Sequence, residues 1–141
     1  MTTTPFFLFK TSTIEPLDYQ HEGTTLTVDL NQEWIKELST WEQLSPDADW
    51  LRSFPQIILP FPKFTDGRSY SIALLLKKQL QFQGTLLAGG EIALDQIPYL
   101  YEIGFDGFEV PQSNRDQNLH SIQSIVDRFN YRPQAYQRTH L

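Results

Sequence analysis

The sequence predicts an α/β fold built from four successive βα units. Short apolar or β-prone runs begin near residues 24, 56, 85 and 107, so they recur every 22 to 32 residues. That interval is the length of one strand plus a crossover helix. Four such units form either half of a TIM-barrel-like arrangement or a small open parallel sheet, with right-handed crossovers in both. We expect a single domain over residues 1–141.

The clearest part of this pattern is a βαβαβ unit over residues 56–110. Its strands are expected at residues 57–59, 85–88 and 107–110, because each is a brief run bounded by Gly, Pro or Asp. Ligands of parallel sheets bind at the carboxyl ends of the strands. The loops PFPKFTDGR, GGE and PQSNRDQ follow these three strands and are therefore the place to look for chemistry.

Helical periodicity predicts four crossover helices. The first is expected to be capped by Asn31, and SPDAD at residues 45–49 indicates a turn-rich break after it. The remaining signals are a cap at Asp66 or Ser69 for the second helix, a cap at Asp95 and a stop at Gly104 for the third, and a fourth helix over residues 116–129.

The two ends of the chain carry weaker signals. Residues 1–23 are expected to form an N-terminal arm, either flexible or paired as an edge strand through the apolar run at residues 6–9. Residues 130–141 are expected to form a C-terminal tail that is mobile or docks as a strand. The unpaired edges of a half-barrel also invite pairing with a second chain, so we expect a homodimer whose interface includes one of these two segments.

Composition and charge exclude several classes of function. The chain has no cysteine, which excludes disulfides, thiolate-bound zinc, cysteine-ligated iron–sulfur clusters and a cysteine nucleophile within it. The net charge is −6, and residues 1–62 hold nine acids against three bases. An acidic chain without a basic stripe is a poor candidate for binding nucleic acid. No run approaches the length of a membrane span, and we expect a cytoplasmic protein.

The loop FPKFTDGR holds the densest group of polar side chains. Lys63, Thr65 and Arg68 lie between a strand and a helix start, where two cations, the free backbone N–H groups and the helix dipole would together bind an anion. The alternative is a solvated loop in which Asp66 caps the helix and pairs with Arg68. The loop lacks the glycine pattern of a Walker motif.

Three carboxylates follow neighbouring strands. Asp66, Glu91 and Glu109 are expected near the carboxyl ends of adjacent strands, where they could serve as catalytic acid and base groups or bind a hard metal ion. The alternative is that they are helix caps or ion-pair partners. The glycines beside Glu91 lack the spacing of a dinucleotide-binding loop, and the sequence has no HExxH or GxSxG motif. The sequence therefore names no cofactor and no metal site.

Three segments, FPKFTDGRSYSIALLL, GTLLAGGEIALDQIPYL and GFDGFEV, resemble the bacterial family of unknown function DUF934 in order and spacing. The likeness is most specific over residues 56–110. The matching positions are Phe61, Pro62, Lys63, Asp66, Gly67, Arg68, Tyr70, Ser71, Gly90, Asp95, Gln96, Gly104, Phe105, Asp106, Phe108 and Glu109. Two positions depart from the family pattern: Glu91 stands where Asp is usual, and Leu94 stands where Arg is usual.

The resemblance implies a pathway rather than a mechanism. Members of this family are commonly described as oxidoreductases of sulfite reduction, because their genes lie beside those for the sulfite reductase hemoprotein and adenylyl-sulfate reductase. We therefore expect an accessory protein of assimilatory sulfate and sulfite reduction that supports the sulfite reductase hemoprotein by binding or electron delivery. The alternative is an enzyme that acts on a small anionic or phosphorylated substrate at the carboxyl ends of the strands.

Overall fold

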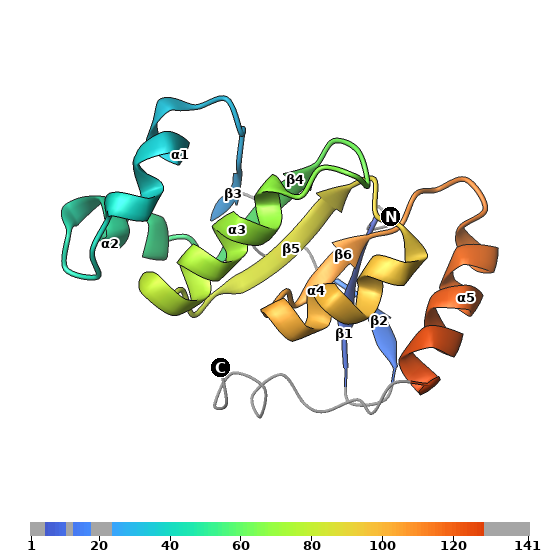
Figure 1. Ribbon diagram of the computed structural model, residues 1–141. Helices are drawn as coiled ribbons and strands as arrows, with labels where there is room; N and C mark the ends of the chain where they lie inside the picture. Colours follow the sequence, from blue (N-terminus) through green and yellow to red (C-terminus); the bar gives the residue numbers. More distant parts are fainter. Residues whose placement is uncertain (1–4, 11–12, 18–23, 129–141) are drawn as a thin grey trace.

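Four parallel strands form the centre of the protein in the order in which they occur in the chain. The computed structural model describes residues 5–10, 13–17 and 24–128. The parallel strands are β3 (Thr25–Thr27), β4 (Gln56–Phe61), β5 (Thr85–Gly90) and β6 (Gly107–Glu109), as Figure 1 shows. The whole sheet has six strands in the order β2-β1-β6-β5-β4-β3. The predicted mixed α/β class and the positions of these four strands are confirmed.

The N-terminal strand β1 (Phe6–Phe9) lies inside the sheet, between β6 and the edge strand β2 (Ile14–Pro16). It runs antiparallel to both neighbours and pairs Phe6 with Glu109. The sequence predicted an edge strand or a flexible arm here, and for residues 6–9 this was wrong. The physical reason is the run FFLF itself: three of its side chains are buried, and a strand that is apolar on both faces belongs in the interior of a sheet.

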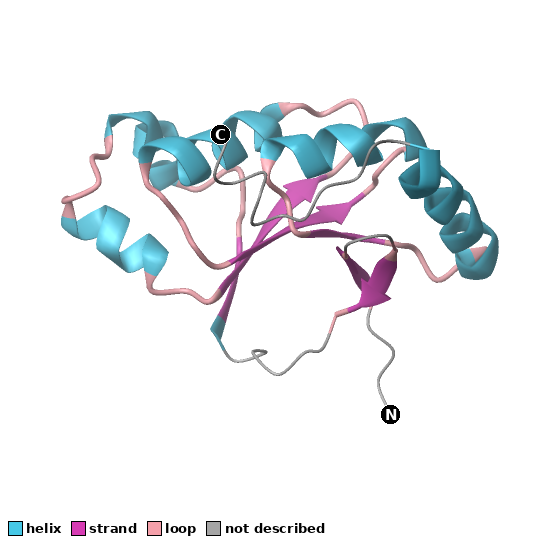
Figure 2. Cartoon of the chain, turned by 90° about the horizontal axis from the view of Figure 1, so that it is seen from below, coloured by secondary structure: helices cyan, strands magenta, loops and turns pink. Residues whose placement is uncertain are grey.

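The helices gather along one side of the sheet (Figure 2). They are α1 (Glu33–Glu37), α2 (Pro46–Arg52), α3 (Arg68–Leu74), α4 (Ile97–Ile103) and α5 (Arg115–Arg128). Alternate strand residues such as Ile57, Leu59 and Phe61 face these helices and form the main core with them. The opposite sheet face carries a smaller cluster made by Phe6, Leu17 and Leu87, with Leu8 and Ile58 packed against it.

The segment predicted as a turn-rich break is the start of helix α2. The Ser45 hydroxyl accepts the backbone N–H of Ala48 at 3.4 Å, and Pro46 occupies the first turn. Both are signals of a helix start, because Ser satisfies a free N–H and Pro has none to satisfy. Ala48 and Leu51 are fully buried, so the helix is held by its apolar side.

Helix α1 is shorter than predicted and begins one residue later. Its N-cap is Gln32, and no side chain caps it; Asn31 instead donates its backbone N–H to the Asp29 carboxylate at 2.9 Å. A 3-10 turn, Leu38–Thr40, continues the helix and buries Leu38.

The caps predicted for the next two helices are wrong. The N-cap of α3 is Gly67, because the Asp66 carboxylate binds Arg68 and the Ser69 hydroxyl donates to the carbonyl of Pro60. Asp95 lies inside the turn that precedes α4, and the N-cap of that turn is Ala93.

Helix α3 continues as a π-helical segment, Leu75–Gln79. A 3-10 turn, Leu94–Gln96, precedes α4, which ends at Gly104 with a left-handed φ of 119°, as predicted. Helix α5 agrees with the predicted fourth helix; Phe129 and the predicted tail, residues 130–141, lie outside the described residues.

An ion pair lies under the amino ends of the strands. Lys77 on the π-helical segment places Nζ 3.9 Å from a carboxylate oxygen of Asp106, and their side chains are only 7% and 16% exposed. The same oxygen accepts the backbone N–H of Leu86 at 2.8 Å. This pair connects the α3 side of the helix layer to the starts of β5 and β6.

Candidate functional site

The carboxyl ends of β4, β5 and β6 meet at one edge of the sheet. Phe61 pairs with Gly90, and Ala88 pairs with Phe108, so the three loops that follow these strands start side by side. The backbone N–H of Glu91 donates to the carbonyl of Phe61 at 2.8 Å and extends this alignment by one residue. The structure therefore places the predicted polar loops together at this edge.

Asp66 and Arg68 form a two-pronged ion pair in the loop after β4. Arg68 donates Nε to one carboxylate oxygen at 3.1 Å and Nη2 to the other at 2.7 Å, while its backbone N–H also donates to Asp66 at 3.1 Å. These bonds from Arg68, the side-chain ones above all, lower the pKa of Asp66 from 3.8 to about 2. The same pairing raises the pKa of Arg68. The two charges neutralise each other, which is the alternative arrangement that the sequence suggested for this loop.

The other predicted members of the anion site lie on the surface. Lys63 and Thr65 are both exposed. The carbonyl of Lys63 accepts the backbone N–H of Asp66 at 2.9 Å, which closes a turn around these residues. The turn keeps the Lys63 backbone beside the Asp66–Arg68 pair. The Lys63 side chain is open to solvent.

Gln96 joins the loop after β4 to the loop after β5. Its Nε2 donates to the carbonyl of Phe64 at 3.0 Å and to the hydroxyl of Tyr70 at 2.8 Å, while its Oε1 accepts the N–H of Ala93 at 2.7 Å. Burial raises the pKa of Tyr70, so its hydroxyl stays protonated. The family resemblance had marked Gln96 and Tyr70, but only the structure shows that they contact each other.

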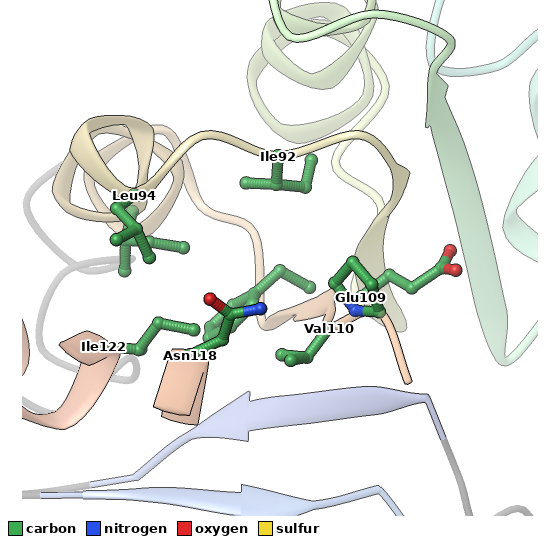
Figure 3. Close-up of a pocket in the computed structure, with 9 residues that line it drawn as sticks. Ile92, Leu94, Glu109, Val110, Asn118 and Ile122 are labelled. Atoms are coloured by element: carbon green, nitrogen blue, oxygen red, sulfur yellow. The ribbon is translucent and has the colours of Figure 1, made fainter. Parts of the chain in front are cut away.

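Glu109 turns to the sheet face opposite the helices. Its Oε1 accepts the backbone N–H of Gly90 at 2.9 Å, on the side of Gly89 that Ile58 and Phe6 also cover. Figure 3 shows its carboxylate pointing away from Leu94 and Ile122. Glu91 is exposed. In the part of the chain that the structure describes, no ion pair or hydrogen bond links the three predicted carboxylates, and each meets different surroundings.

An apolar pocket opens between β6, the start of α4 and the start of α5 (Figure 3). Its volume is about 100 Å³. It is lined by Ile92, Leu94, Ile97, Phe108, Glu109, Val110, Pro111, Asn118 and Ile122. The sequence does not predict this pocket, because its lining comes from three elements whose packing no local pattern specifies.

A second, more open pocket lies beside Arg68 at the carboxyl ends of β3 and β4. It has a volume of about 300 Å³. The other lining residues are Val28, Asp29, Leu30, Asn31, Pro60 and Pro62. Arg68 and Asp29 give this pocket one cation and one anion, and the rest of its wall is largely apolar.

Two further findings concern the described residues alone. Among residues 5–10, 13–17 and 24–128, no group of three or more His, Asp or Glu side chains is placed to hold a metal ion. No helix in those ranges is both long and apolar enough to cross a membrane.

Comparison with known proteins gives one match. The model of a family described as a bacterial protein of unknown function, DUF934, matches residues 34–141. The match includes α1 except its first residue, the helices α2 to α5, the strands β4 to β6 and all three loops at the carboxyl edge. No curated protein and no solved structure is similar enough to this chain to count as a match.

Proposed function

This chain belongs to the DUF934 family of bacterial proteins of unknown function, and we propose that it is an accessory protein of assimilatory sulfate and sulfite reduction. In this proposal it supports sulfite reductase by binding it or by helping electron delivery, and the redox centre belongs to its partner. The association of the family with the genes of sulfite reduction supports the choice of pathway.

The observation that carries the accessory role is the Asp66–Arg68 ion pair. An acid or base catalyst that works at neutral pH needs a pKa near that pH, and the pKa of Asp66 is held at about 2. An anion at Arg68 would have to compete with the Asp66 carboxylate, which already accepts hydrogen bonds from Nε at 3.1 Å and from Nη2 at 2.7 Å. The most polar loop of the chain is thus stabilised by its own contacts, which favours a structural loop over a reacting one.

The absence of cysteine also supports an accessory role in which the partner carries the redox centre. A chain without thiolates cannot hold a cysteine-ligated cluster or pass electrons through a dithiol. Electron delivery by this protein would therefore use a group supplied by a partner or a bound cofactor.

A complementation experiment tests the proposal. A strain without this gene should grow poorly with sulfate as the sole sulfur source, and the wild-type protein should restore growth and co-purify with the sulfite reductase hemoprotein. The variants Glu91→Gln and Glu109→Gln should restore growth equally, because an accessory protein needs no carboxylate chemistry at these positions. Normal growth of the deletion strain on sulfate would contradict the proposal.

The pocket beside Arg68 favours a second candidate function, an enzyme that acts on a small anionic or phosphorylated substrate. In this case Lys63, Thr65 and Arg68 bind the anion and a nearby carboxylate exchanges a proton. Thermal shift with sulfite, sulfate, adenylyl sulfate, FMN and NADPH tests it, since a ligand at one hundred times its Kd stabilises a fold by about 2.7 kcal/mol. A shift that Arg68→Ala abolishes would favour the enzyme, and no shift with any compound favours the accessory protein.

We also propose that the four βα units form a half-barrel. The sequential order of β3, β4, β5 and β6 and the single layer of helices support it, since a doubly wound sheet has helices on both faces. In this arrangement the face that carries Ile58 and Leu87 corresponds to the inside of a barrel.

The proposed homodimer follows from the edges of such a half-barrel. The edge strands are β2 and β3, and each has only three residues. Size-exclusion chromatography with light scattering should give twice the 16.4 kDa chain mass at micromolar concentration. A mass near that of one chain at every concentration contradicts the dimer. A dimer that survives removal of residues 130–141 contradicts an interface made by the tail; the arm cannot be removed in the same way, because β1 lies inside the sheet.

A further inference from the structure

A ladder of four aromatic rings runs outward from the core in the part of the chain that contains α1 and α2. These two helices lie at one end of the molecule in Figure 1. Trp41 stacks on Trp34 with ring centroids 5.7 Å apart, Trp34 meets the edge of Trp50 at 5.5 Å, and Trp50 meets the edge of Phe54 at 5.3 Å. Trp41 is buried, whereas Trp50 is 43% exposed. The rings are fixed against one another, so the exposed tryptophan is held in place.

Leu44 adds a second exposed apolar group in the loop between α1 and α2. Its side chain is 92% exposed. Arg52 holds this loop in place: Nη1 donates to the carbonyl of Leu80 at 2.9 Å, and Nη2 donates to the carbonyl of Gln43 beside Leu44. We call Trp34, Leu44, Trp50 and Phe54 the tryptophan surface. Tryptophan is enriched at the centres of protein interfaces, and a preformed surface loses little entropy on binding.

The charged side chains on α1, α2 and their connection, which carry the tryptophan surface, are mostly acidic. The exposed acids of α1, α2 and their connection are Glu33, Glu37, Glu42, Asp47 and Asp49. The two bases are already engaged, since Lys36 lies 3.8 Å from Glu33 and Arg52 lies 2.6 Å from Asp49. Helical spacing of three residues places Glu37 beside Trp34 and Asp47 beside Trp50.

From these features we propose that the tryptophan surface is a docking site for a protein that presents Lys or Arg side chains around an apolar patch. Apolar contact with Leu44 and Trp50 supplies affinity, and the surrounding carboxylates select a basic partner and speed its approach. Cations of the partner can also lie against the faces of the tryptophan rings. A nucleic acid is excluded as the occupant, because its phosphates would meet the same carboxylates. The inference does not depend on the role in sulfite reduction.

Binding of two designed peptides to the full chain tests this proposal. The probe is a labelled amphipathic helical peptide with Lys and Arg around a Leu face, and its counterpart has Glu in place of every Lys and Arg. Fluorescence anisotropy should show binding of the basic peptide that weakens as salt is raised, and no binding of the acidic one. Glu37→Gln with Asp47→Asn, and separately Leu44→Ser, should each raise the Kd about tenfold.

The matched controls lie elsewhere on the protein. Glu102→Gln with Asp127→Asn also removes two negative charges, one from α4 and one from α5. Leu94→Ser removes an apolar side chain that is 40% exposed. Both should leave the Kd within about twofold. The proposal would be overturned if the basic peptide does not bind or if the acidic peptide binds equally well. It would also be overturned if the control variants weaken binding of the basic peptide as much as the test variants do. Leu44 is so exposed that its replacement leaves the fold intact, so a loss of binding there reports on the surface.

Discussion

Oε1 of Glu109 accepts a hydrogen bond from the backbone N–H of Gly90 at 2.9 Å and so joins the end of β6 to the end of β5. Glu109→Ala should lower the free energy of unfolding by about 1 kcal/mol, because the Gly90 N–H loses a charged acceptor. Glu109→Gln keeps an acceptor oxygen and should cost less than half as much. Urea unfolding of the three proteins measures this, and equal losses in both variants would show that the hydrogen bond does not stabilise the fold.

The Asp66–Arg68 pair predicts a pH dependence of stability. Because the folded pKa of Asp66 lies at about 2, below its ordinary 3.8, the stabilisation is fully present above pH 3.8 and is lost as the pH falls towards 2. Arg68→Ala should therefore lower Tm at neutral pH and reduce the further fall of Tm in acid. The control Lys63→Ala, an exposed cation in the same loop, should follow the wild-type pH profile. Parallel acid profiles for Arg68→Ala and the wild type would contradict the assignment.

Gly90 is required by the backbone geometry at the carboxyl edge. Its φ is +104°, and a Cβ there would lie 2.4 Å from the carbonyl oxygen of Phe61. Gly90→Ala should therefore destabilise the protein by about 2 kcal/mol or more. Gly67→Ala is the control, since its φ is −92° and the nearest atom to an added Cβ is 3.9 Å away. Chemical denaturation should separate the two variants by more than about 1 kcal/mol, and similar losses would contradict the argument.

The buried pair of Lys77 and Asp106 predicts non-additive mutations. Lys77→Met should destabilise the protein by about 3 kcal/mol, because it leaves a largely buried carboxylate without its cation. Lys77→Met combined with Asp106→Asn should recover part of that loss, since the amide oxygen can still accept the N–H of Leu86. Guanidinium unfolding of Lys77→Met, Asp106→Asn and the double variant gives the double-mutant cycle. Strictly additive losses would show that the two side chains do not interact energetically.

The strands β3 to β6, the end of α4 and the extent of α5 could be predicted from the sequence because their signals are local. A continuous apolar run such as residues 57–59 carries its own strand signal, and Gly104 carries its own helix stop. Helix α2 was missed for a related reason: Ser, Pro and Asp occur in turns and also in the first turn of a helix, and the burial of Ala48 and Leu51 decides between the two.

Features that depend on which segments meet could not be predicted in the same way. The run at residues 6–9 is β-prone, but its pairing with β6 depends on the burial of both of its faces in the assembled sheet. At the candidate site, the sequence located the loops and suggested the Asp66–Arg68 pairing as one of two arrangements. The contact of Gln96 with Tyr70 and the direction of the Glu109 side chain required the structure, since they arise between separate loops.

The pairing of β1 with β6 has a consequence for folding on the ribosome. Phe6 is paired with Glu109, about 100 residues later in the chain, so β1 leaves the ribosome long before its partner is made. At synthesis rates of about 5–20 residues per second, the run FFLF waits for roughly 5–20 s without its neighbour in the sheet. During that time the nascent chain exposes three phenylalanines that the finished protein buries. The run at residues 6–9 is therefore a segment that a chaperone can bind until β6 has been made.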